Sequence, residues 1–128
     1  MPRFGCLLVL VTLLPGCFSS VVTNRAALLP PLPKDCTVTW EHGGPDRLLE
    51  LVAKEKFVQV AFISATPAVR EFTPKLKKHL RPKVCKRGGN YVLMTGSFGE
   101  GARGTSSFEV LNSEGDKAKA AQPGPVTD

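Results

Sequence analysis

The four cysteines are the residues of this 128-residue chain with the widest choice of chemistry. A thiol can form a disulfide, bind a metal, attack a substrate or accept a lipid, and its neighbours and compartment decide which. Cys36 and Cys85 stand in no C-x-x-C motif, and His42 and His79 lie at no recognisable ligand spacing. A metal site or a catalytic thiol therefore has little support, although both alternatives stay open until the compartment is considered.

The first sixteen residues indicate that the chain is exported. Arg3 is followed by an apolar stretch, residues 6–14, and then by the small residue Gly16. This layout is typical of a secretory signal peptide, and the apolar stretch is too short to span a bilayer as a mature helix. We therefore expect residues 1–16 to be removed.

Cys17 stands directly after that predicted cleavage point. The run Leu14-Pro15-Gly16-Cys17 resembles the lipobox of bacterial lipoproteins, in which the thiol receives a lipid and becomes the mature N-terminus. Pro15 departs from the Ala or Ser that is usual in that motif. Phe18 favours the outer membrane, because an Asp at this place argues for inner-membrane retention in enterobacteria. The resemblance implies an outer-membrane lipoprotein anchored through Cys17, and the alternative is an ordinary signal peptide beside an incidental cysteine.

Export also narrows the chemistry of the remaining thiols. Cys6 would leave with the signal peptide and Cys17 would be blocked by lipid, so Cys36 and Cys85 would remain in a compartment that oxidises thiols. We expect these two residues to pair as a structural disulfide. Closing a loop of about 49 residues would stabilise the domain by about 4 kcal/mol.

Composition divides the mature chain into three parts. Residues 17–34 end in a proline-rich run that holds neither a helix nor a strand ladder, which predicts a lipidated N-terminus followed by an extended tether. Residues 35–112 carry the alternating and helical patterns of one small domain. Residues 113–128 lack an apolar period and are expected to be a disordered tail.

Hydrophobic patterns predict an α+β domain. Strands are expected at residues 36–41, 57–63, 91–95 and 105–111. Residues 46–54 favour a short helix, with a strand as the alternative in so short a run. An apolar stripe from residue 69 to residue 84 predicts the main helix, within 67–87, broken at Pro74 and Pro82. The expected architecture is a sheet of about four strands packed on one main, broken helix and braced by one disulfide. The expected aromatic core or its rim consists of Trp40, Phe57, Phe62, Phe72, Tyr91 and Phe108.

The stretch that ends the main helix carries a family resemblance. It reads Val84-Cys85-Lys86-Arg87-Gly88-Gly89-Asn90-Tyr91-Val92. With the Cys before the first strand, the run from Pro45 to Ala53 and the apolar strand, it is similar to small bacterial envelope lipoproteins, among them the signalling domain of the Rcs stress-sensor lipoprotein and the heavy-metal-binding-domain superfamily. Val84 and Tyr91 depart from the small residues usual there. The resemblance implies a disulfide-braced domain that acts by binding, and it carries over no metal ligand.

Signals for catalysis are weak. Residues 99–104 satisfy G-x-G-x-x-G, but a strand pattern follows where phosphate binding needs a helix, so a hairpin loop is expected. The chain has no G-x-S-x-G, H-E-x-x-H or P-loop motif, and His42 is expected to be a turn residue. We therefore predict no catalytic residue, no metal and no cofactor.

Positive charge gathers on the main helix of a chain whose net charge is +6. Seven cations and no acid lie between residues 75 and 87: Lys75, Lys77, Lys78, Arg81, Lys83, Lys86 and Arg87. They avoid the apolar stripe, so they are either a solvated helix face or a surface for anionic headgroups or an acidic envelope partner. Nucleic acid is a poor candidate for an exported protein without a nucleic-acid motif.

These observations give three hypotheses. The first is a lipid-anchored, noncatalytic protein of the outer membrane that binds a protein partner or an anionic envelope surface. The second is a structural subunit of a larger envelope assembly, in which residues 18–32 would order against other subunits. The third is a small secreted enzyme or metal binder.

Overall fold

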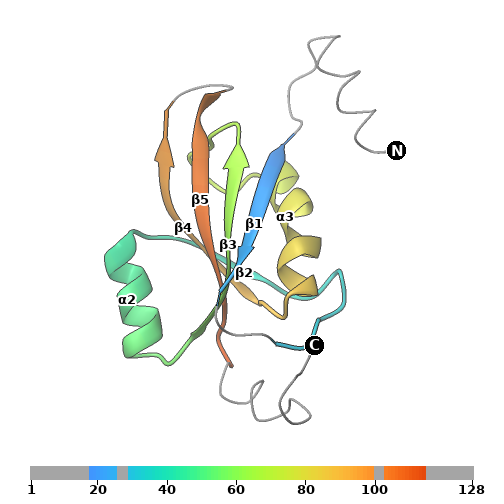
Figure 1. Cartoon of the computed structure of the whole chain (residues 1–128), viewed down its shortest axis with the longest axis vertical. Coiled ribbons are helices and arrows are strands. Elements are labelled where there is room, and N and C mark those ends of the chain that lie inside the picture. Colours follow the sequence, from blue (N-terminus) through green and yellow to red (C-terminus); the bar gives the residue numbers. More distant parts are fainter. Residues whose placement is uncertain (1–17, 26–28, 100–102, 115–128) are drawn as a thin grey trace.

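One mixed sheet of five strands forms the centre of the computed structural model (Figure 1). The structure describes residues 18–25, 29–99 and 103–114. The strand order is β1-β3-β5-β4-β2, in which β2 runs parallel to β4 and all other neighbours are antiparallel. The strands are β1 (Ser19–Asn24), β2 (Thr39–His42), β3 (Val58–Thr66), β4 (Tyr91–Phe98) and β5 (Thr105–Asn112).

A helix packs on each face of this sheet. Helix α3 (Pro74–Lys86) buries Leu76, Leu80 and Val84 in the larger core. There they meet the strand residues that point to the same face of the sheet. Helix α2 (Pro45–Ala53) buries Leu51 against Leu93 and Leu111, on the opposite face. Because successive strand residues point to opposite faces, β4 and β5 contribute to both cores. The α+β class predicted from the sequence is confirmed.

The strand count differs from the predicted four, and the additional strand lies in the predicted tether. Residues 19–24 pair along their length with β3, from Ser19 opposite Thr66 to Asn24 opposite Ala61. The sequence here alternates, so that Val22 packs on the larger core while Val21 is 67% exposed. The prolines downstream do not prevent this pairing, because they lie beyond the strand.

The proline-rich segment also contacts the domain. Leu29 is buried in the larger core, and the Leu32 N–H donates to the Cys85 carbonyl at 2.7 Å. Residues 18–25 and 29–34 are therefore part of the folded unit, and the expectation of a free tether over residues 17–34 is corrected for them. An apolar residue inside a proline-rich run can still anchor it by burial, which composition alone does not reveal.

The main helix is shorter than predicted and continuous. It begins at Pro74, after Thr73, whose Oγ1 accepts a hydrogen bond from the Leu76 N–H at 3.2 Å. Pro74 suits the first turn, where no N–H is needed. Pro82 lies inside the helix without dividing it, so the predicted break is wrong. The proline is exposed, while the apolar stripe on the other side of the helix holds both halves against the sheet.

The predicted disulfide is confirmed. Cys36 and Cys85 are bonded with a Cα–Cα distance of 5.9 Å and a sequence separation of 49. The bond ties the segment before β2 to the last turn of α3. Five of the six aromatic residues are placed as predicted, since Phe108 is fully buried, Trp40 and Phe72 pack on the larger core, and Phe57 and Tyr91 pack on the smaller one. Phe62 is partly buried on the sheet, with the Cζ of Arg25 lying 5.1 Å from its ring centre.

Four further predictions concern segments that the structure describes only in part or not at all. The glycine-rich residues 99–104 connect β4 and β5, which are antiparallel neighbours, as a hairpin loop requires, although residues 100–102 are not among those described. The predicted signal peptide, Cys17 and all but the first two residues of the tail also lie outside the described residues. In the part that is described, no helix is long and apolar enough to cross a membrane.

Candidate functional site

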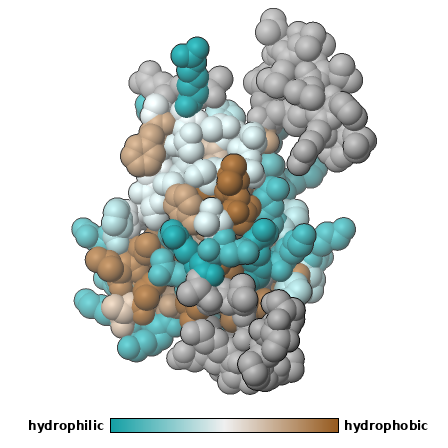
Figure 2. Space-filling model, in the orientation of Figure 1, coloured by the Kyte–Doolittle hydropathy of each residue, from teal (hydrophilic) through white to brown (hydrophobic). Residues whose placement is uncertain are grey.

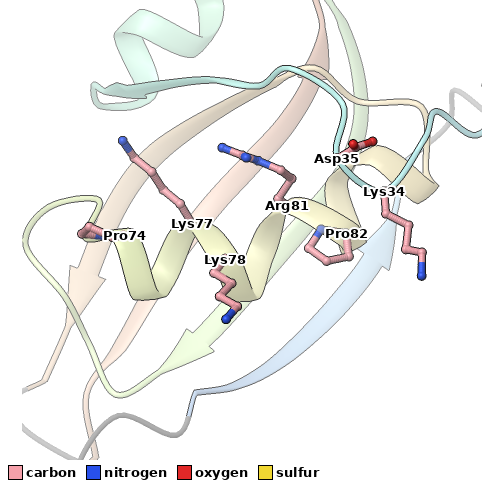
Figure 3. A pocket seen from close by; sticks show the side chains of 7 residues that line it. All are labelled: Lys34, Asp35, Pro74, Lys77, Lys78, Arg81 and Pro82. Carbon is pink, nitrogen blue, oxygen red and sulfur yellow. The ribbon is translucent and has the colours of Figure 1, made fainter.

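A groove lies between α3 and the segment that leads to β2 (Figure 3). Its volume is about 490 Å³, and we call it the α3 groove. In Figure 3, Lys77 and Arg81 extend from the same side of the helix, and Lys78 extends from the other side. Seven residues line the groove, four of them cations, one an acid and two prolines: Lys34, Asp35, Pro74, Lys77, Lys78, Arg81 and Pro82. The volume is within the range of small-ligand sites.

An aromatic stack supports the cations of this groove. The Nζ of Lys77 and the Cζ of Arg81 each lie 6.0 Å from the centre of the Trp40 ring. Phe72 lies 5.2 Å from Trp40 and 5.7 Å from the buried Phe108, measured between ring centres. Lys77 and Arg81 are one helical turn apart, so both can approach the same ring face. The stack therefore links the groove to the core and restricts where the two charges can move.

The charges of the groove are not neutralised by neighbouring acids. None of the salt bridges within residues 18–25, 29–99 and 103–114 uses Lys34, Lys77, Lys78 or Arg81. The Nε of Arg81 is buried and has no hydrogen-bond partner among those residues. A guanidinium forms strong bidentate hydrogen bonds with carboxylate or phosphate. An anionic group is therefore the kind of ligand that these side chains could bind.

The structure separates the seven cations that the sequence placed together. Three of them, Lys77, Lys78 and Arg81, line the α3 groove, whereas Lys75, Lys83, Lys86 and Arg87 do not. Arg87 donates from Nε to Asn24 Oδ1 at 3.0 Å and so joins the end of α3 to the end of β1.

Sequence reasoning missed Lys34 and Trp40 as parts of this site. Lys34 stands on the far wall because Cys36, two residues later, is bonded to Cys85 at the end of α3. The predicted disulfide was therefore the available signal for Lys34. Trp40 lies in β2 next to β4, and its position under α3 follows from a strand order that the sequence did not provide.

His79 joins α3 to the edge strand. Its Nε2 lies 2.9 Å from the Ser20 Oγ, and its ring centre lies 5.7 Å from that of Phe18. Burial lowers the pKa of His79 from its ordinary value of 6.5, and the nearby charge of Lys83 lowers it further. The neutral imidazole is therefore the form that suits the folded protein.

This shift predicts a stability that depends on pH. Because the pKa of His79 is lower in the folded protein than in the unfolded chain, the unfolded chain binds the proton more tightly. The contribution is fully present above pH 6.5 and is lost as the pH falls from 6.5 toward the lowered pKa. We expect the midpoint of thermal unfolding to fall over this interval, and His79→Gln to reduce that slope. An unchanged slope in the variant would assign the pH dependence to other groups.

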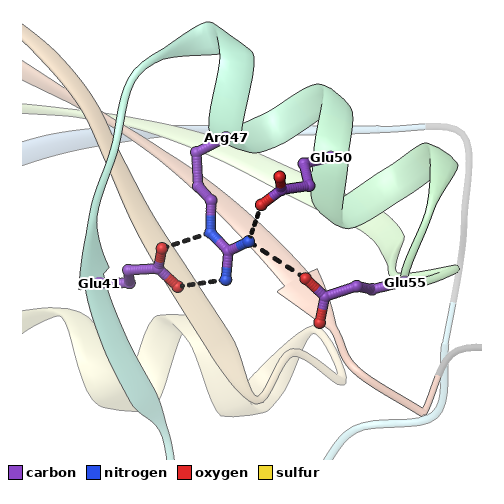
Figure 4. Close-up of polar contacts among 4 residues, drawn as sticks. All are labelled: Glu41, Arg47, Glu50 and Glu55. Carbon is purple, nitrogen blue, oxygen red and sulfur yellow. Dashed lines mark hydrogen bonds and ion pairs between the residues drawn. The ribbon is translucent and has the colours of Figure 1, made fainter.

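A second cluster of charges joins α2 to β2 (Figure 4). Arg47 donates from Nε to Glu41 at 2.5 Å, from a terminal nitrogen to Glu55 at 3.1 Å, and to Glu50. Hydrogen bonds that Arg47 donates to Glu41 and then to Glu50 raise its pKa above the ordinary value, so it remains charged. His42, the last residue of β2, packs its ring 5.4 Å from that of Phe72. This cluster fixes the position of α2, and its arginine is already occupied by protein carboxylates.

A buried carboxylate marks the sheet face opposite α3. The side chain of Glu109 is 4% exposed and pairs with Arg25, just beyond the end of β1. Gln59 donates to the same carboxylate at 3.4 Å, and Arg25 lies 5.1 Å from the centre of the Phe62 ring. The pair therefore helps to hold the end of β1 on the sheet. Within the described residues, no three His, Cys, Asp or Glu side chains are grouped as metal ligands.

Comparisons with known proteins give information about the fold only. No family model matches the chain, and no curated protein matches it. Among solved structures, the chain is similar to the crystal structure of a Francisella virulence factor, FvfA, in its orthorhombic form. The sequences are 11% identical, the match covers 77% of this chain and 100% of that chain, and the TM-score is 0.51. At this identity, the similarity shows a shared fold and nothing about activity or partners.

Proposed function

We propose that this chain is a noncatalytic bacterial envelope lipoprotein, held in the outer membrane by a lipid on Cys17, that binds an acidic segment of another envelope protein in the α3 groove. The observation that carries the binding role is the groove itself. Four cations line it, none of them paired in a described salt bridge, and two stand over Trp40.

The shape of the groove favours a protein segment over a flat lipid surface. Lys34 and Asp35 form one wall and α3 forms the other, so side chains of both segments line a concave space, with Lys77 and Arg81 extending from one side of α3 (Figure 3). An extended segment can enter such a space, whereas a bilayer reaches protruding side chains first. The cations need ligands with several acidic groups, because each exposed ion pair alone contributes only about 0.2–1 kcal/mol.

The second hypothesis, a structural subunit of an envelope assembly, has less support. It required residues 18–32 to order against other subunits. Residues 19–24 instead pair with β3 of the same chain, and Leu29 and Leu32 contact the core and Cys85. That segment is therefore already engaged within its own domain.

Reversing two charges tests the proposed groove. In Lys77→Glu/Lys78→Glu, we expect affinity for a fluorescent oligo-glutamate peptide to fall roughly tenfold, about 1.4 kcal/mol, because attraction becomes repulsion at two positions. Fluorescence anisotropy at several salt concentrations measures the affinity, which should also weaken as salt rises. Lys78 is exposed, and Lys77 is partly buried with its Nζ 6.0 Å from the Trp40 ring centre, so the thermal unfolding midpoint should fall only slightly, by the roughly 0.5–1 kcal/mol of an exposed cation–π contact.

The matched control is Lys54→Glu/Lys56→Glu, which changes the net charge equally at exposed positions away from the groove. It should alter peptide affinity by less than about twofold, because distant exposed charges are screened. Equal losses in both variants would show that only overall charge matters. Tighter binding to anionic lipid vesicles than to the peptide, lost in Lys77→Glu/Lys78→Glu, would replace the protein partner with a membrane surface.

A further inference from the structure

One end of the sheet gathers segments that are distant in the sequence. The register places Ser19 at the start of β1 opposite Thr66 at the end of β3, and Phe98 at the end of β4 opposite Thr105 at the start of β5. These termini lie together at the top of Figure 1. We call this the β1-start end of the domain.

The loop between β3 and α3 belongs to the same end. The Ser97 hydroxyl donates to the Val69 carbonyl at 3.0 Å, and Ser106 Oγ accepts from the Val69 N–H at 2.8 Å. Arg70, the next residue, is exposed. On the neighbouring hairpin Arg103 is also exposed. Neither arginine takes part in a salt bridge among the described residues, and both belong to loops at this end of the sheet.

An apolar side chain projects from this end. Phe98 is 70% exposed, although most aromatic rings of the domain are at least partly buried. Its strand partner, Thr105, begins β5. On the face shown in Figure 2, apolar residues occur in separate patches among pale or hydrophilic residues. An exposed aromatic flanked by arginines is the combination found where proteins meet a lipid interface.

The short stretch of chain between Cys17 and β1 determines what this end faces. Cys17 is two residues before Ser19, and consecutive Cα atoms are about 3.8 Å apart, so their Cα atoms are separated by at most about 7.6 Å. The described start of β1 leaves no room for a spacer between a lipid on Cys17 and the sheet. The strand is held in place by its pairing with β3, by His79 and by the Arg25–Glu109 pair.

We propose that the β1-start end of the domain docks directly on the bilayer surface, with Phe98 in the boundary between headgroups and acyl chains and with Arg70 and Arg103 on anionic headgroups. This inference rests on the proposed lipid at Cys17. The strands then run roughly perpendicular to the bilayer plane. Helix α2 lies far from the bilayer, because it packs on the beginning of β4 and the end of β5. The α3 groove remains open at the side for its partner.

Tryptophan fluorescence tests this orientation in the intact lipidated protein. Phe98→Trp is reconstituted in vesicles of phosphatidylethanolamine and phosphatidylglycerol whose acyl chains carry bromine, which quenches nearby indole. We expect roughly half of the added emission to be lost, because the ring would lie about 5–10 Å into the interface. The control is Leu49→Trp, at a 66% exposed position on α2, where little quenching is expected. The unsubstituted protein, with its single Trp40, supplies the background.

A second variant tests the arginines. Adding Arg70→Glu and Arg103→Glu to Phe98→Trp should reduce the quenching, because both charges would then be repelled by phosphatidylglycerol. Equal quenching at positions 98 and 49, or none at either, in protein that carries its lipid would overturn the docking while leaving the anchor intact. Protein that carries no acyl mass and does not join vesicles would instead overturn the proposed function on which the docking rests.

Discussion

Replacing Cys36 and Cys85 together with serine is expected to lower the free energy of unfolding by about 4 kcal/mol, because the bond closes a loop with a sequence separation of 49. For a domain of this size, such a loss corresponds to a fall of roughly 15–30 °C in the thermal unfolding midpoint. Circular dichroism during heating measures it. The effect is large because a small domain has only about 5–15 kcal/mol of stability in total.

The same substitution should also weaken the α3 groove. Lys34 and Asp35 belong to the segment that the bond fixes against α3, so without the bond this wall is held mainly by the Leu32–Cys85 backbone hydrogen bond and the burial of Leu29. Binding of the oligo-glutamate peptide should decrease even below the unfolding midpoint.

Reduction of the unsubstituted protein is the control for this prediction. It should lower the midpoint by a similar amount and should have no effect on the double serine variant. A single Cys36→Ser substitution should match the double variant closely, since either change removes the same bond. A fall of less than about 5 °C in all three cases would mean that the bond contributes little to stability.

Local patterns in the sequence predicted those parts of the fold that depend on local physics. The apolar stripe of α3 and the alternating strands arise from periodicity, and the disulfide follows from the number of cysteines and the expected compartment. The limits of α3 were predicted less well, because Pro82 reads as a break while burial of Leu76, Leu80 and Val84 outweighs the cost of one missing backbone hydrogen bond.

Residues 18–34 show why the remaining part was not predictable from composition. Three prolines within four positions suggest an extended tether, and the alternation in residues 19–24 is short. Pairing with β3, burial of Leu29 and the contact of Leu32 with Cys85 all involve residues far away in the sequence. The same distinction applies to the α3 groove, where the helical cations were visible in the sequence but Trp40 and Lys34 depend on tertiary structure.

Loss of lipidation should have a larger effect on location than any other single change. In Cys17→Ala, we expect the amount of protein in the outer-membrane fraction to fall at least about tenfold, because each buried acyl CH₂ contributes about 0.8 kcal/mol to membrane binding. Neither helix of the described part of the chain could cross a bilayer. The basic side chains and Phe98 alone would give only weak, salt-sensitive attachment.

Mass spectrometry of the mature N-terminus decides between lipidation and the ordinary signal peptide. The unsubstituted protein should begin at Cys17 and carry the added mass of acyl chains. The control Pro15→Ala restores the residue usual in a lipobox, so it should keep the protein in the outer membrane and increase the processed fraction. An N-terminus at another residue without acyl mass would refute the anchor.

The distance argument for the β1-start end would then lose its basis. The charges of the α3 groove would still predict binding to acidic segments, because they do not depend on Cys17.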